Sequence, residues 1–294
     1  MATRRTPTPL QPLINKIESF EGVDEPAKAL SWKVSETLGP GALKDALSGT
    51  AIGHALHPML TDVVIGSFLS ATALDVIGGD ESHVASERLI ALGIAAYPPT
   101  ALTGMSDWAD GSVGNAAVRR VGIAHAAANS AALALYAASF VARRRGKKGK
   151  GTALGLLGAG ALGFAGYLGG HLTLVNGVGV DQTVFDAGPS GWTEAADVAA
   201  LVEGEPVRVV VEDTPVLLLR RAERTFALHD RCNHRGCSLV GRGEVSGDEI
   251  ECTCHGSRFS LEDGSLLQGP ATQPQPAFET RERDGKVELR ALYS

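Results

Sequence analysis

Three long stretches without a charged side chain constrain this 294-residue chain more than any other feature. They are residues 89–106, 121–142 and 151–180, with lengths of 18, 22 and 30 residues. A helix of about 20 apolar residues can cross the hydrocarbon core of a bilayer. A fourth, shorter stretch, 63–74, lies between Asp62 and Asp75. The pattern predicts four antiparallel membrane-spanning helices, near residues 60–78, 88–106, 120–142 and 152–175.

The alternative to a membrane domain is a soluble helical bundle with an alanine-rich core. Such a bundle shows a polar face on every helix. The segment 152–175 has no polar face, and its many small residues suit close helix packing in lipid. We therefore expect a membrane protein, in which Pro98 and Pro99 kink or break the second span.

The rest of the chain differs in character on either side of these spans. Residues 1–58 are polar and read as a tail with one or two short surface helices rather than a cleavable signal peptide. After a linker at 179–190, residues 191–294 show short β-rich runs separated by turn signals. The expected fold is thus multi-domain, with an all-α four-helix transmembrane domain at 59–178 and an all-β domain at 191–294.

Composition limits the kind of function. The formal net charge is −6, so the chain has no overall basic field with which to hold nucleic acid. Its four cysteines all lie between Cys232 and Cys254, which excludes a general disulfide framework and indicates one local cysteine site.

Two short motifs contain those cysteines. CNHRGC begins at Cys232 and contains His234, and CTCHGS begins at Cys252 and contains His255. Two thiolates and two imidazoles can hold two bridged irons, with the thiolates on one iron and the histidines on the other. Mixed Cys/His sets also bind zinc, which is the structural alternative.

These motifs, with Gly269-Pro270 after the second, closely resemble those of Rieske iron–sulfur domains. The resemblance implies stacked antiparallel sheets and a [2Fe–2S] cluster on Cys232, His234, Cys252 and His255, with both histidines at an exposed tip. It also implies that three further residues line or support the cluster, namely Gly256, Ser257 and Pro270. Ser257 matches the high-potential members, where its hydroxyl bonds a cluster sulfide.

The two spare cysteines, Cys237 and Cys254, match positions where Rieske proteins of quinol-oxidising complexes carry a disulfide between the ligand loops. We expect that bridge, although both cysteines would remain thiols in a reducing compartment. Two positions depart from those proteins. Phe259 replaces a tyrosine that bonds a ligand sulfur, and Arg235 replaces a leucine of the quinol-docking surface.

The helical half resembles a bacterial family of four-helix membrane domains of unknown function, through GHALHP (53–58), TGMSDW (103–108) and GYLGGH (166–171). Antiparallel alternation places five ionisable residues at one membrane face: His54, His57, Asp107, His125 and His171. Ionisable groups in a membrane are candidates for function. They could ligate haem b or a metal ion, or they could merely fix helix packing through hydrogen bonds.

The basic run RRRGKKGK, at 143–150, lies between the third and fourth spans. Positive loops stay in the cytoplasm, so this run predicts an extracytoplasmic β domain on a multi-pass cell-membrane protein. Arg119, Arg120 and the basic residues of the tail argue against that orientation.

We expect a membrane-anchored one-electron carrier that exchanges electrons with redox proteins or a quinone. One alternative is a quinol-oxidising oxidoreductase subunit, with a haem in the membrane half. Another is a redox sensor that acts through Cys237 and Cys254. An oxygenase catalytic subunit is not expected, because such enzymes need two further histidines and a carboxylate for mononuclear iron, and no histidine follows His255.

Overall fold

The structure is a computed structural model that describes residues 9–292. The first eight residues of the predicted tail, and residues 293–294 of the predicted β domain, lie outside the described part. The chain folds as two compact units. One contains residues up to Thr37 together with Leu56–Val178, and the other contains Leu38–Ala55 together with residues from Gly179 onward.

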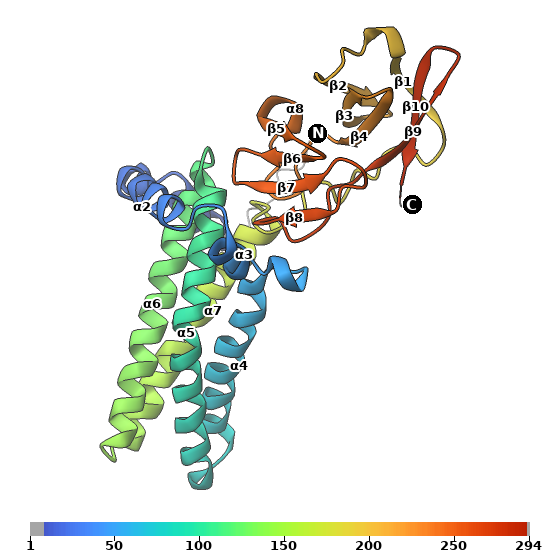
Figure 1. The fold of residues 1–294 in the computed structure, drawn as a ribbon. Helices are drawn as coiled ribbons and strands as arrows, with labels where there is room; N and C mark the ends of the chain where they lie inside the picture. The colour runs from blue at the N-terminus through green and yellow to red at the C-terminus, as the bar shows by residue number, and fades with distance from the viewer. Residues whose placement is uncertain (1–8, 293–294) are drawn as a thin grey trace, which may run out of the picture. The chain divides into compact units, whose positions relative to one another are not determined.

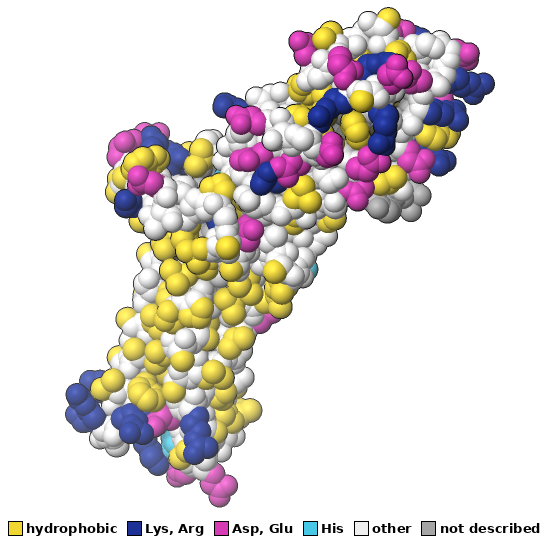
Figure 2. Space-filling model, in the orientation of Figure 1, with side chains coloured by type: hydrophobic (Ala, Val, Ile, Leu, Met, Phe, Trp, Pro, Cys, Tyr) yellow, Lys and Arg dark blue, Asp and Glu magenta, His cyan; other side chains and the backbone are white. Residues whose placement is uncertain are grey.

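The helical unit is built on four long helices, which confirm the four predicted spans. They are α4 (Leu56–Ile77), α5 (His83–Ser112), α6 (Ala116–Arg144) and α7 (Lys148–Leu174). Successive helices run in opposite directions (Figure 1). Among the described residues, these four elements are long and apolar enough to cross a membrane. On the face that Figure 2 shows, the surface of these helices is largely hydrophobic along its length, and charged side chains gather toward the helix ends.

Small residues let these helices pack closely around a few aromatic rings. Phe68 and Tyr136 stack with their ring centroids 4.0 Å apart, and both are fully buried. A Cβ atom added to Gly158 of α7 would lie 2.9 Å from the Tyr136 ring, and one added to Gly93 of α5 would meet Phe68. The glycines of the long apolar segments therefore give space to the aromatic residues of neighbouring helices.

The helix α5 continues through Pro98 and Pro99 without a break. The prolines therefore do not break the second span, and a kink at this point stays a prediction. A proline removes one backbone donor and clashes with the preceding turn. The two prolines free the carbonyls of Ile94 and Ala95, and membrane helices tolerate such a loss when neighbouring groups satisfy the freed carbonyls.

One ion pair is enclosed within the helical unit. The guanidinium of Arg143 on α6 donates to both carboxylate oxygens of Asp75 on α4. The side chains are only 3% and 1% exposed. Ser86 donates to the same carboxylate, and the Arg143 Nε donates to the Ser139 hydroxyl. Every charged atom of the pair thus lies among polar partners, as a buried charge requires.

Two shorter helices of this unit precede the spans: α1 (Gln11–Glu18) and α2 (Asp24–Thr37). The Asp24 carboxylate accepts hydrogen bonds from Arg120 and Arg119, which hold the pKa of this carboxyl well below its usual range. Glu18 contacts His171 at 3.0 Å. These contacts attach α1 and α2 to the ends of the long helices.

The second unit contains three antiparallel sheets, which confirm the predicted all-β domain. One sheet has the order β1-β10-β9, another β2-β3-β4 and the third β5-β6-β7-β8. The strands are β1 (Thr193–Asp197), β2 (Pro206–Val211), β3 (Thr214–Arg221), β4 (Arg224–His229), β5 (Gly243–Ser246), β6 (Glu249–Cys252), β7 (Ser257–Ser260), β8 (Leu266–Gln268), β9 (Phe278–Arg283) and β10 (Lys286–Ala291). The strand β3 is buried through most of its length, and its alternate side chains enter two separate hydrophobic cores.

Two segments that the sequence placed outside the β domain belong to this unit. The first is residues 38–55, which include α3 (Ala42–Ser48). The second is the predicted linker, 179–190. Its Gln182 amide donates to the Asn233 carbonyl at 2.9 Å, and its Asp186 carboxylate contacts the fully buried His229 at 3.1 Å.

Candidate metal centre

The first cysteine motif forms a tight loop between β4 and the short helix α8 (Leu239–Arg242). The Cys232 amide donates to the Cys237 carbonyl and the Gly236 amide donates to the Cys232 carbonyl, both at 2.8 Å. Gly236 has a φ of +79°, which favours glycine. Asp230 accepts hydrogen bonds from the Ser238 hydroxyl and the Val240 amide, so it fixes the end of the loop at α8.

The second motif forms a turn between β6 and β7. The Gly256 amide donates to the Cys252 carbonyl at 2.8 Å, which closes one turn of chain over four residues. Gly256 has a φ of +86°. The two cysteine motifs thus occupy two short loops, each shaped by its own backbone bonds and one glycine in the left-handed region.

The thiols of Cys232 and Cys252 meet between these loops. Both are buried, neither is in a disulfide, and they share a hydrogen bond. That bond, together with the amides of Cys254 and His255, lowers the pKa of Cys252 to about 7. The bond to Cys252 and burial raise the pKa of Cys232, although the amides of His234 and Arg235 act in the opposite direction. Backbone N–H groups therefore face both sulfurs, as thiolate ligands of a metal require.

The imidazoles of His234 and His255 lie edge to face, with ring centroids 5.0 Å apart. Burial lowers the pKa of His234 well below its usual value, and the positive charge of Arg235 acts in the same direction. A neutral imidazole is the form that binds a metal ion. The donor set of the two loops consequently consists of two buried thiols and a pair of adjoining imidazoles, which fits an iron–sulfur group of mixed ligation.

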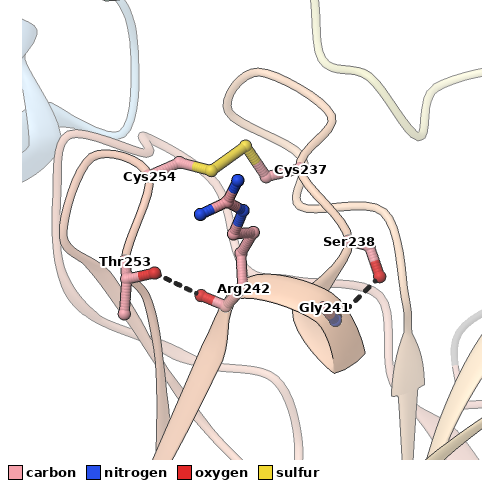
Figure 3. The surroundings of a disulfide bond; sticks show 6 residues. All are labelled: Cys237, Ser238, Gly241, Arg242, Thr253 and Cys254. Carbon is pink, nitrogen blue, oxygen red and sulfur yellow. Dashed lines mark hydrogen bonds between the residues drawn. A yellow bond between two sulfur atoms is a disulfide. The ribbon is translucent and has the colours of Figure 1, made fainter.

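A disulfide joins the two loops, as the resemblance implied: Cys237 is bonded to Cys254. The sulfurs of Cys237, Cys254 and Cys252 lie within 4.8 Å of one another, so the bridge packs directly beside the buried thiol of Cys252. The side chain of Arg242 extends toward the disulfide, and the Arg242 carbonyl accepts a hydrogen bond from Thr253 (Figure 3).

The other residues expected near the cluster occupy defined positions. Ser257 is buried, and its hydroxyl oxygen accepts from the Ala271 amide at 3.0 Å, which leaves its proton for another acceptor. Gly256 is also buried, beside a second-loop histidine that is itself half-buried. Phe259 is fully enclosed in the hydrophobic core. The histidine tip is thus less open than the resemblance implied, because another segment of this unit, described below, lies against it.

One buried side chain that sequence reasoning missed, Gln275, holds the first loop in place. Its amide donates to the carbonyls of His229 and Arg231, both at 2.7 Å, and its oxygen accepts from the Asn233 amide. The side chain of Asn233 in turn donates to the Gln273 carbonyl. No sequence signal marks Gln275, because its partners lie more than 40 residues away.

The ionisable residues expected at one membrane face divide between the two units. His54 belongs to the unit of the sheets, and His57, Asp107, His125 and His171 belong to the helical unit. The Nδ1 of His57 lies 3.0 Å from the Thr100 carbonyl, and that of His125 lies 2.8 Å from the Ala165 carbonyl. Asn129 also donates to His125, and His171 contacts Glu18. These bonds match the packing role, and a haem or metal at these residues stays a prediction.

Comparison with known proteins finds a matching family for the β domain and another for the helical domain. Residues 191–279 match the family described as "Rieske [2Fe-2S] domain", and residues 53–182 match "Predicted membrane protein (DUF2231)". The ferredoxin component of the naphthalene 1,2-dioxygenase system of Pseudomonas putida is 33% identical over 82 residues, which are 28% of this chain and 78% of that protein. The anthranilate 1,2-dioxygenase ferredoxin subunit of Burkholderia cepacia is 29% identical over 98 residues, 33% of this chain and 90% of that subunit.

Relatives that are catalytic subunits match over a smaller share of their length. The terminal oxygenase component of carbazole 1,9a-dioxygenase from a Sphingomonas species is 35% identical, over 26% of this chain and 20% of that protein.

Among solved structures, a complex of reduced oxygenase and oxidized ferredoxin in carbazole 1,9a-dioxygenase contains a chain that is 28% identical to this one. The match has a TM-score of 0.32 and covers 35% of this chain and 97% of that one.

The chain thus combines a domain that matches the Rieske [2Fe-2S] model with a predicted membrane domain. The chain belongs to the Rieske [2Fe-2S] family.

Proposed function

We propose that this protein is a membrane-anchored one-electron carrier, with a [2Fe–2S] cluster held by Cys232, Cys252, His234 and His255. The single observation that carries the proposal is the convergence of two buried thiols between loops that also present an adjoining imidazole pair. A cluster of this kind would accept and release one electron at a time.

The surrounding residues suit that task. Amides of four loop residues face the two sulfurs and stabilise negative charge on them. The Ser257 hydroxyl has a proton to donate toward the cluster, since its oxygen already accepts from Ala271. The disulfide ties the two ligand loops together, which limits their separation when the charge of the centre changes.

Redox proteins are the partners we propose. Two of the relatives quoted above are ferredoxin components of dioxygenase systems, and these two match across most of their length. A quinone remains the alternative partner, because the disulfide occupies the position that the quinol-oxidising proteins use. The four apolar helices would anchor the carrier in lipid.

Spectroscopy of the detergent-purified full-length protein tests this function. We expect about two irons per chain and, after reduction with dithionite, an EPR signal with an average g value below 2, which is typical of one unpaired electron on a cluster of this ligation. Stoichiometric zinc without an EPR signal would overturn the proposal. Additional sharp reduced bands of haem would favour the second redox site on the histidines of the helical unit.

We also propose that the Rieske domain lies on the extracytoplasmic side. The disulfide supports this orientation, because disulfides persist in oxidising compartments. The basic connection between α6 and α7 supports it as well.

Protease treatment of intact spheroplasts tests the orientation. We expect cleavage within the Rieske domain from outside, and protection of an epitope tag inserted at Gly149, in the basic run before the apolar part of α7. Spheroplasts lysed before treatment serve as the control and should lose both. Cleavage of the tag in intact cells, with the Rieske domain protected, would establish the opposite orientation.

A further inference from the structure

Residues 38–55, which we call the cap segment, belong to the unit that contains the sheets, although helices of the other unit precede and follow them in the chain. The segment contains α3 and a 3-10 turn at Thr50–Ile52. It is separated from the rest of its unit by more than 120 residues of sequence. Its place on the sheets therefore depends on the contacts that it makes there.

The first contact lies on the second ligand loop, at Gly256. A Cβ atom added to Gly256 would lie 2.4 Å from the Cγ and 2.6 Å from the Cβ of the Pro40 ring. The ring of Pro40 therefore fills the space into which a side chain at position 256 would project. Gly256 follows His255 directly, so the cap segment covers the loop beside a proposed ligand.

Three polar contacts join the cap segment to residues 269–273, the stretch that follows β8. The Gly269 backbone lies against the Asp45 carboxylate and acts to lower the pKa of Asp45, but burial outweighs this contact and raises that pKa above its usual value. The Thr50 hydroxyl donates to the Ala271 carbonyl at 3.1 Å. The Gln273 side chain donates to the Gly53 carbonyl. The segment is thus attached along most of its length.

The cap segment is itself partly enclosed in this unit. Lys44, which precedes Asp45 on α3, is buried although it carries a charge. The contact of Pro40 with Gly256 and the bonds to residues 269–273 therefore hold the segment against the second ligand loop.

We propose that the cap segment occupies the face of the ligand loops on which a soluble redox protein would dock, and that it must move aside before such a protein exchanges an electron with this chain. The inference rests on the proposed function. In the exchange, one electron passes from the reduced chain to the acceptor. The chain is oxidised, the acceptor is reduced, and no bond or proton is involved.

The strength of the attachment is suited to such a movement. Each hydrogen bond contributes only modestly to the net stability of the contact, and short segments with few contacts open locally without global unfolding. A small redox molecule needs much less surface than a protein, whose specific interface buries several hundred square ångströms on each side. The cap segment should therefore hinder a protein acceptor far more than a small one.

The test compares two acceptors in stopped-flow oxidation of the reduced full-length protein, namely cytochrome c and ferricyanide. The variant is Asp45→Ala combined with Thr50→Val, which removes two of the attachments. We expect the rate constant with cytochrome c to rise roughly tenfold, and the rate constant with ferricyanide to stay within about twofold. Unchanged rates with cytochrome c, or equal acceleration with both acceptors, would overturn the proposal.

Two controls keep the result interpretable. Thr280→Val removes a hydroxyl that donates to the Thr225 carbonyl, far from the cap segment in sequence, and should leave both rates unchanged. Hydrogen exchange of residues 266–273 should accelerate in the cap variant, and Thr50→Ser alone should restore protection lost in Thr50→Val. An exchange rate that does not respond would show that these bonds do not hold the segment. Absence of the EPR signal in the wild type refutes the proposed function instead, before any kinetics.

Discussion

Replacing Cys252 with serine is expected to abolish the reduced EPR signal and to lower bound iron by more than about tenfold. Cys252 is one of the two buried thiols that meet between the ligand loops, and the amides of Cys254 and His255 face its sulfur. A serine hydroxyl stays protonated at neutral pH and is a harder donor that suits iron–sulfide groups poorly. Iron content, visible absorption and EPR of the purified variant measure the outcome.

The matched control replaces the other two cysteines of the same two loops. The double variant Cys237→Ser and Cys254→Ser should retain the EPR signal, because the disulfide sulfurs are not proposed ligands. The bridge closes a loop across 17 positions, and its loss should lower the free energy of unfolding by about 3 kcal/mol. Retention of the cluster in Cys252→Ser, or its complete loss in the double variant, would contradict the ligand assignment. A redox-sensing role would require that this double variant lose its output with the cluster intact.

The cysteine motifs could be interpreted from sequence because the residues that meet in each loop are also close in the chain. Cys232 and His234 are two positions apart, and the hydrogen bonds that shape their loop join residues four or five positions apart. The four spans were equally accessible, since a stretch of chain that crosses a bilayer must lack charge throughout its length.

The features that sequence analysis missed all depend on partners far away in the chain. The contact of Pro40 with Gly256 joins positions more than 200 residues apart, and residues 38–41 show no periodicity that would announce it. The continuity of α5 through Pro98 runs against the local propensity of its sequence, since proline disfavours a helix interior. Asp75 looked like the boundary of a short apolar stretch, although it is enclosed with Arg143.

That enclosed pair leads to a second large effect. Asp75→Asn should lower the free energy of unfolding of the helical unit by about 3–5 kcal/mol, since it leaves the Arg143 guanidinium buried without a counter-charge. Asparagine keeps nearly the same volume and still accepts from Ser86, so the loss reports charge rather than packing. Unfolding in mixed micelles with increasing dodecyl sulfate, followed by circular dichroism, measures the change.

An exposed pair between α6 and α5 provides the comparison. Arg144 and Glu87 lie 3.4 Å apart, with side chains 68% and 26% exposed, and Arg144→Met should cost no more than about 1 kcal/mol. The double variant Asp75→Leu and Arg143→Met removes both buried charges, so it should be more stable than Asp75→Asn. If Asp75→Asn costs no more than Arg144→Met, the buried charges do not depend on each other. If instead the double variant loses as much free energy of unfolding as the single variants Asp75→Leu and Arg143→Met lose together, the two charges are not coupled. The pair would then serve only to fill space between α4 and α6.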